Sequence, residues 1–118
     1  MVRLKPALMK TQDDVEADEL REESIDASAA LIETCPGGCE VTLAGVLRSL
    51  TIRPVGATPA LEAELYDGTG VIDLVWLGRR AIVGIEAGRR LVVTGRLTGG
   101  QGRHRMYNPK YALRPGVS

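Results

Sequence analysis

Apolar and polar residues alternate with the two-residue period of β-strands through residues 40–114. In the first run, Leu43 and Leu47 share one side of the chain with Gly45. Residues 53–59 hold two prolines and a glycine, which predicts a loop after this run. The pattern as a whole predicts five strands, at residues 41–48, 61–66, 71–77, 90–97 and 103–113, the last of them bent or ended near Pro109.

Turn signals and one short segment indicate how these strands are connected. Asp67-Gly68 is a strong hairpin signal between the second and third strands. Residues 79–86 predict a helix of one or two turns, whose buried face would hold Ala81, Ile82, Val83 and Ile85. Three strands, a short helix and two more strands are typical of an all-β OB fold, a five-stranded, partly open barrel. A five-stranded SH3-like barrel is the alternative, but it offers no natural place for residues 79–86.

Ahead of the strands the pattern becomes helical and more polar. Residues 13–32 predict a helix that begins at a cap formed by Asp13 or Asp14. Its apolar stripe is thin, so we expect this helix to lean on the rest of the domain or on a partner. Pro36-Gly37-Gly38 ends the helical pattern. The chain is therefore expected to consist of an acidic tail and N-terminal helix (1–39), an OB-fold barrel (40–114) and a C-terminal tail (115–118).

Charge separates the same two parts of the chain. Residues 1–39 carry four basic and nine acidic residues, a net charge of −5. Residues 40–118 carry eleven basic and six acidic residues, a net charge of +5, and ten of the eleven are arginine. Arginine suits phosphate because its planar guanidinium donates two hydrogen bonds at once. This asymmetry favours a polyanionic partner for the barrel, although an arginine-rich solvated surface would give the same composition.

Composition narrows the class of protein further. Hydrophobic residues make up 44% of the chain, with no Phe, which predicts an aliphatic core. No apolar run approaches the roughly 20 residues that a membrane span needs, and no secretory signal is recognised at the N-terminus. We therefore expect a cytoplasmic protein without a membrane partner.

Three motifs occur in order within the predicted barrel. They are Glu64-Leu-Tyr-Asp-Gly-Thr-Gly-Val-Ile-Asp-Leu-Val-Trp-Leu-Gly78, Gly88-Arg-Arg-Leu-Val-Val-Thr-Gly-Arg-Leu97 and Met106-Tyr-Asn-Pro-Lys-Tyr-Ala-Leu113. Together they resemble the OB-fold wedge domain of RecG-type branch-migration helicases. They are also similar to the anticodon-binding domains of class II tRNA synthetases and to small stand-alone actinobacterial OB-fold proteins. The chain departs from the helicases in having no Walker-type phosphate loop, and the acidic leader lies outside the resemblance.

An OB fold binds a single strand across its second and third strands, between the loops that join strands one to two and four to five. Arg48 and Arg53 border the first of these loops, and Arg96 and Arg103 border the second. Tyr66 falls on the wet side of its strand, where it is a candidate for base stacking. The complete set of expected nucleic-acid-binding residues is Arg48, Arg53, Tyr66, Arg96, Arg103, His104, Arg105, Tyr107 and Lys110. DNA is favoured over RNA as the partner.

Other residues weigh against tight binding or catalysis. Rings are few, Trp76 is expected in the core, and Glu62, Glu64 and Asp73 would repel phosphate. A protein-interaction or oligomerisation OB module, with the acidic helix as contact, therefore stays open as the alternative. A single His and no nucleophile–base pair predict a non-enzymatic protein without cofactor or metal. Asp67 is interpreted as a turn residue, and Cys35 and Cys39 as inert thiols or a small disulfide.

Overall fold

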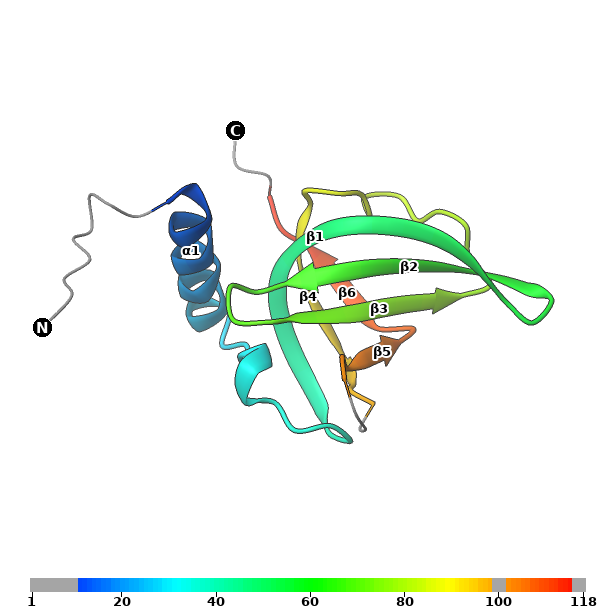
Figure 1. Cartoon of the computed structure of the whole chain (residues 1–118), viewed down its shortest axis with the longest axis horizontal. Coiled ribbons are helices and arrows are strands. Elements are labelled where there is room, and N and C mark those ends of the chain that lie inside the picture. The colour runs from blue at the N-terminus through cyan, green and yellow to red at the C-terminus, as the bar shows by residue number, and fades with distance from the viewer. Residues whose placement is uncertain (1–10, 99–101, 116–118) are drawn as a thin grey trace, which may run out of the picture.

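The computed structural model describes residues 11–98 and 102–115 and shows a mostly-β chain with one N-terminal helix (Figure 1). The helix leads through a short 3-10 turn into the first of six strands. The elements are α1 (Gln12–Asp26), η2 (Ile32–Thr34), β1 (Glu40–Val55), β2 (Thr58–Tyr66), β3 (Val71–Leu77), β4 (Arg90–Arg96), β5 (Arg105–Tyr107) and β6 (Lys110–Leu113).

All six strands belong to one sheet, with the order β5-β3-β2-β1-β4-β6. Neighbouring strands pair antiparallel, except that β3 and β5 are parallel. The long strand β1 pairs with β4 over residues 40–46 and with β2 over residues 46–55, so it bends from one neighbour to the other. Gly45 lies at the bend, where a Cβ atom would collide with the carbonyl of Tyr66, and a register shift follows between Leu47 and Ser49.

The expected fifth strand, residues 103–113, is in fact two strands at opposite edges of the sheet. β5 pairs with β3, whereas β6 pairs with β4. The chain turns between them at Asn108, which has a φ of 49°, and Pro109, which cannot donate a ladder hydrogen bond. The result is a single six-stranded sheet that is not closed, with one bridge between Leu97 and Met106.

The loop expected at residues 53–59 is wrong, because these residues extend β1 and β2 into a projecting hairpin (Figure 1). Only Gly56 and Ala57 form its turn, and Gly56 has a φ of 62°. Pro54 lies directly opposite Pro59 in the register. The two prolines are tolerated in strands because this pair position needs no N–H for the ladder.

The short helix expected at residues 79–86 is also wrong, since this segment is irregular and holds a single turn at Val83 and Gly84. Gly78 and Gly84 have φ values of 76° and 88°, which interrupt any helical path. Ile82 and Ile85 are buried as expected, and the amide of Ile85 donates to the Ile82 carbonyl over 3.0 Å. Ala81 and Val83, by contrast, are exposed.

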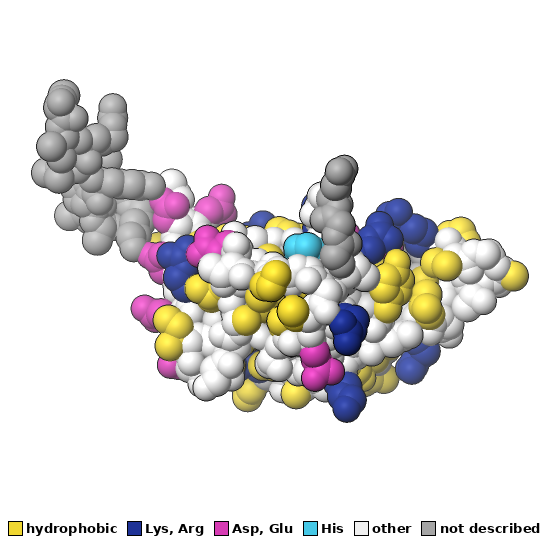
Figure 2. Space-filling view, turned by 90° about the horizontal axis from the view of Figure 1, so that it is seen from below, with side chains coloured by type: hydrophobic (Ala, Val, Ile, Leu, Met, Phe, Trp, Pro, Cys, Tyr) yellow, Lys and Arg dark blue, Asp and Glu magenta, His cyan; other side chains and the backbone are white. Residues whose placement is uncertain are grey.

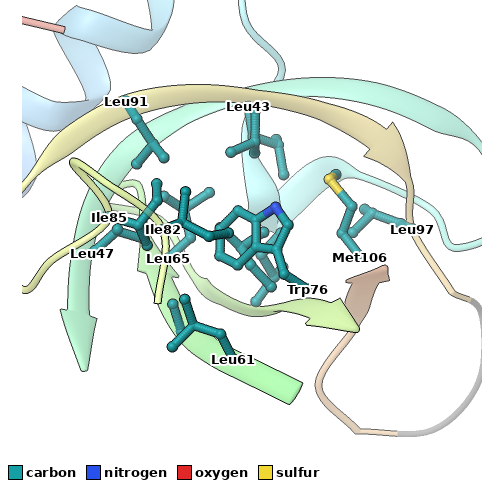
Figure 3. Close-up of a cluster of buried hydrophobic side chains, with 14 of the residues drawn as sticks. Leu43, Leu47, Leu61, Leu65, Trp76, Ile82, Ile85, Leu91, Leu97 and Met106 are labelled. Carbon is teal, nitrogen blue, oxygen red and sulfur yellow. The ribbon is translucent and has the colours of Figure 1, made fainter. Parts of the chain in front are cut away.

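The core is aliphatic, as composition predicted, and gathers around Trp76 (Figure 3). The indole is 5% exposed, which confirms the expectation that it belongs to the core. Its Nε1 donates to the Pro109 carbonyl over 3.3 Å, and Tyr111 approaches it edge-on with ring centres 6.1 Å apart. Trp76 therefore joins β3 to the turn that separates β5 from β6.

The leader is part of the same packing unit. The capping residue of α1 is Thr11, whose side chain accepts from the Asp14 amide over 3.1 Å, so the cap expected at Asp13 or Asp14 lies slightly earlier. The helix ends at Asp26, before the expected residue 32. Leu20 and Ser24 are its buried residues, and the Ser24 hydroxyl donates to the Ala44 carbonyl of β1 over 3.4 Å. No helix in the described ranges is long and apolar enough to cross a bilayer.

Candidate nucleic-acid interface

A polar groove of about 260 Å³ crosses the outer face of β1, β2, β3 and β5. It is polar because alternate residues of each strand point away from the core; on β1 these are Ser49, Thr51 and Arg53. Its remaining walls come from the neighbouring strands and from the segment that leads into β5. They are Glu62, Ala63, Glu64, Asp73, Arg103 and Arg105.

Three arginines from two segments far apart in the sequence converge on this groove, and each meets a carboxylate. Arg103 contacts both Glu64 and Asp73, with N–O distances of 2.6 and 3.0 Å. Arg105 lies 3.8 Å from Asp73. Arg53 lies 3.7 Å from Glu62. The groove thus holds three positive and three negative side chains, and its formal charge is zero.

Protonation follows from these contacts. The hydrogen bond from Arg103 holds the pKa of Glu64 below its ordinary value, so this carboxylate stays ionised at neutral pH. The pKa of Arg103 is raised by the same hydrogen bond and by Asp73. The pKa of Arg105 is raised first by its hydrogen bond to Tyr107 and then by the charge of Glu62. The groove therefore consists of charged side chains that already form ion pairs with one another.

Arg48 and Tyr66 lie together between the groove and α1. The Arg48 guanidinium carbon is 3.7 Å from the centre of the Tyr66 ring, which is cation–π distance. The same guanidinium donates to Glu16 of α1 over 2.9 Å. One face of the ring expected to stack on a base is therefore covered by an arginine that the leader already holds.

The remaining expected residues are more dispersed. His104 Nδ1 donates to the Thr98 carbonyl over 2.7 Å, and Tyr107 is 45% exposed beside Arg105. Arg96 donates to the Gly38 carbonyl and does not line the groove. Lys110 lies on β6 and lines a separate hollow with residues of β4. The structure thus brings Arg53, Arg103 and Arg105 together and places Arg96 and Lys110 elsewhere.

Comparison with known proteins gives structural likeness only. The sequence matches no protein-family model and no curated protein. The structure of RecG bound to a three-way DNA junction is similar over 73% of this chain, at 23% identity and a TM-score of 0.59. The fold is OB-like. The matched part spans 12% of the RecG chain. One chain in the structure of a replication protein A heterotrimer bound to single-stranded DNA is similar over 78% of this chain and 75% of that chain, at 20% identity and a TM-score of 0.47.

In this OB-like chain the acidic leader packs on the sheet, as its thin apolar stripe predicted, and is attached there by ion pairs whose partners the sequence did not specify. Arg90, the first residue of β4, contacts Glu23 and lies 3.9 Å from Glu19 of α1. With the pair between Arg48 and Glu16, two arginines of the positive half hold three carboxylates of the negative half. Acidic side chains gather at the α1 end of the molecule (Figure 2). The opposite net charges of the two halves were the signal for this docking.

The Asp67-Gly-Thr-Gly70 turn holds the leader from the other side. Asp67 is fully buried, and its carboxylate accepts from Thr69, from the Gly70 amide and from the Ile32 amide, the last over 2.8 Å. A Cβ atom at Gly68 would collide with the Ala17 carbonyl of α1, and one at Gly70 would meet Ile32 at 2.7 Å. The prediction that Asp67 is a turn residue is confirmed. Gly68 and Gly70 also leave the space in which α1 and Ile32 pack against this turn.

The two cysteines lie near this junction as free thiols. Burial, followed by the charges of Asp67 and Cys39, raises the pKa of the Cys35 thiol, which lowers its thiolate fraction at neutral pH. Among residues 11–98 and 102–115, no three His, Cys, Asp or Glu side chains form a group suited to a metal ion.

Proposed function

We propose that this chain is a nucleic-acid-binding module that contacts the phosphates of single-stranded or branched DNA through its polar groove, without catalysis. The observation that carries the proposal is the convergence of Arg53, Arg103 and Arg105 on one outer face of the OB-like sheet. The similarity to part of RecG, a protein seen bound to a three-way DNA junction, supports it. DNA is proposed over RNA because this structural relative is bound to DNA.

Binding in this groove proceeds by exchange of partners. Each phosphate replaces a carboxylate as the partner of an arginine. Part of the free energy gained from the phosphate contact is therefore offset by the loss of the ion pair. The pair with Glu64 is exposed and is worth only about 0–1 kcal/mol. Asp73 and Glu62 are only 11% and 14% exposed, so the arginines leave these two carboxylates at a higher cost, which keeps the net affinity low. The neutral groove gives no strong steering, and we expect weak, salt-sensitive binding with little sequence preference.

Titration of the full chain against labelled single-stranded, duplex and forked DNA and single-stranded RNA, over a series of salt concentrations, tests the proposal. We expect affinity in the micromolar range at low salt. The logarithm of the binding constant should fall with the logarithm of salt concentration, with a slope of roughly −2 for three arginine contacts to a single strand. Single-stranded and forked DNA should bind more tightly than duplex. Absence of salt-dependent binding at tens of micromolar protein would contradict it.

The leader is expected to oppose nucleic-acid binding, because α1 holds Arg48 and lowers the potential beside the groove. Substitution of Glu16, Glu19 and Glu23 by Gln should raise affinity for single-stranded DNA about threefold to tenfold at low salt, with less effect at high salt. Removal of residues 1–39 is a poorer test, because it would also uncover the core around Ile32.

The matched control for the leader variant carries Glu22→Gln, Asp26→Asn and Glu33→Gln, three exposed acids with no ion pair among the described residues. It changes the net charge equally and should raise affinity less. Fluorescence anisotropy with a labelled oligonucleotide measures both variants. Equal effects would show that only net charge matters and that α1 does not compete locally.

A further inference from the structure

The second half of β1 has a neighbour on only one edge. At Val46 and Leu47 both edges are paired: β2 lies on one side, and on the other Val46 pairs with Arg90 of β4 while the backbone of Leu47 exchanges hydrogen bonds with Arg89 and Gly88 over 2.9 and 2.7 Å. Beyond the register shift at Ser49, the strand pairs with β2 alone. Residues 49–55 therefore form an open edge along the hairpin that projects in Figure 1.

The pairing register shows which backbone groups face this open edge. Pro54 lies opposite Pro59, and neither has an N–H, so this is a non-hydrogen-bonded pair. The Pro59 carbonyl points the other way, toward β3, where it accepts from the Gly78 amide over 2.8 Å. By alternation, the N–H and C=O groups of Leu50 and Ile52 point away from β2. Within the described ranges, no backbone group outside β2 bonds to them.

An apolar hollow of about 370 Å³ lies beside these free backbone groups. One wall is formed by Leu50, Ile52 and Leu61 of the hairpin. The other is the irregular segment that holds Ala81 and Ile85. Ile52 is 55% exposed, whereas Leu61 and Ile85 in the same hollow are buried. An added strand would bury apolar side chains here while its backbone pairs with β1, which is how sheet edges recognise extended peptides.

Charge indicates what kind of strand fits. Residues 48–55 contain two arginines and no acidic residue. Arg80, exposed at the rim of the hollow, has no ion pair within the described part of the chain. A second copy of this chain would bring the same arginines against themselves, which disfavours self-pairing. An acidic strand would instead bring carboxylates to Arg80 and to Arg53, which Glu62 holds only at 3.7 Å.

We propose that the open edge of β1, residues 49–55, binds an extended segment of a partner protein that alternates apolar and acidic residues. Residues of the guest opposite Leu50 and Ile52 share their face and fill the apolar hollow. Those opposite Thr51 and Arg53 carry the acidic side chains. This interaction uses the edge of the sheet and stands independently of nucleic-acid binding.

A nine-residue peptide that alternates valine and glutamate tests the proposal with the full chain. In two-dimensional NMR titrations, the amides of Leu50 and Ile52 should shift on binding. N-methylation at the valines, whose N–H groups face β1, should abolish binding, whereas N-methylation at the glutamates should leave it within about threefold. A peptide alternating valine and lysine should not bind. If neither acidic nor basic peptide shifts these amides at millimolar concentration, the proposal is overturned.

Two variants test the assignment of the surface. Ile52→Pro removes the outward N–H without touching a bond to β2, as Pro54 already does two residues on, and should weaken the acidic peptide at least tenfold. Arg80→Glu should weaken it at least fivefold, whereas Lys110→Glu on β6 should have no effect. Unchanged affinity in both variants, with thermal melting unaltered, would overturn the proposal. Two other results would also overturn it. If the chain forms a dimer that Ile52→Pro abolishes, the edge binds a second copy of the chain, and if oligothymidine displaces the peptide, the peptide occupies the nucleic-acid surface.

Discussion

Neutralising the carboxylates of the groove is expected to raise its affinity for single-stranded DNA about tenfold at low salt. In the variant Glu64→Gln with Asp73→Asn, Arg103 loses both of its ion-pair partners and Arg105 loses one. A phosphate at about 5 Å from each removed charge gains roughly 0.8 kcal/mol per site in water-like dielectric, and two such gains correspond to a factor of about fifteen, which salt reduces toward ten. Fluorescence anisotropy of a labelled oligonucleotide at 50 and 200 mM salt measures the effect, which should shrink at the higher concentration.

Two comparisons make this expectation specific to the groove. Glu40→Gln with Glu86→Gln removes the same formal charge from exposed positions outside it and should change affinity by less than about threefold. Arg103→Ala with Arg105→Ala should act in the opposite direction, lowering affinity and making the salt slope shallower by roughly 1.4, because two phosphate contacts to a single strand are lost. Equal gains from the two acid-to-amide pairs would assign the effect to net charge, and no loss from the arginine pair would place the DNA elsewhere.

The two-residue alternation of apolar and polar residues predicted the strands, because one face of each strand is buried in the core. β3 and β4 were expected at the residues where they occur, and core positions such as Leu43 and Trp76 follow the two-residue alternation. The misplaced features depend on backbone geometry that periodicity does not report. Pro54 and Pro59 indicated a loop by composition, yet as a directly opposed pair they fit the hairpin. The turn at Asn108 and Pro109 divides the expected fifth strand into β5 and β6, which lie at opposite edges of the sheet.

Several residues of the candidate site could be predicted from the sequence, but the contacts between them could not. Sequence order placed Arg53 and Arg103 near the two loops that flank an OB-fold ligand face, and the structure brings them to one groove. The sequence also indicated that Glu64 and Asp73 would oppose phosphate. It did not reveal that each carboxylate forms an ion pair with one of these arginines, because such pairs join residues 30 and 39 positions apart. Arg96 was placed by its loop, but its side chain bonds the Gly38 carbonyl instead.

The largest loss of stability is expected from Asp67→Ala, at about 3 kcal/mol of the free energy of unfolding. Asp67 is fully buried, and its carboxylate accepts from the amides of Thr69, Gly70 and Ile32 and from the Thr69 hydroxyl. Removing it leaves buried N–H groups without acceptors, and each such group costs about 1–3 kcal/mol. Urea denaturation followed by circular dichroism measures the loss.

The same substitution should also release the leader from the sheet, because the Ile32 amide and the Asp67 carboxylate join two segments 35 residues apart. Hydrogen exchange at Ile32 should therefore accelerate more than exchange at Leu74 in the centre of β3. Thr69→Ala removes the hydroxyl that bonds both Asp67 and the Glu33 amide but keeps the carboxylate, so it should cost only about 1 kcal/mol. A loss below about 1 kcal/mol for Asp67→Ala, or uniform acceleration of exchange, would show that packing of Leu20 and Ile32 alone holds the leader.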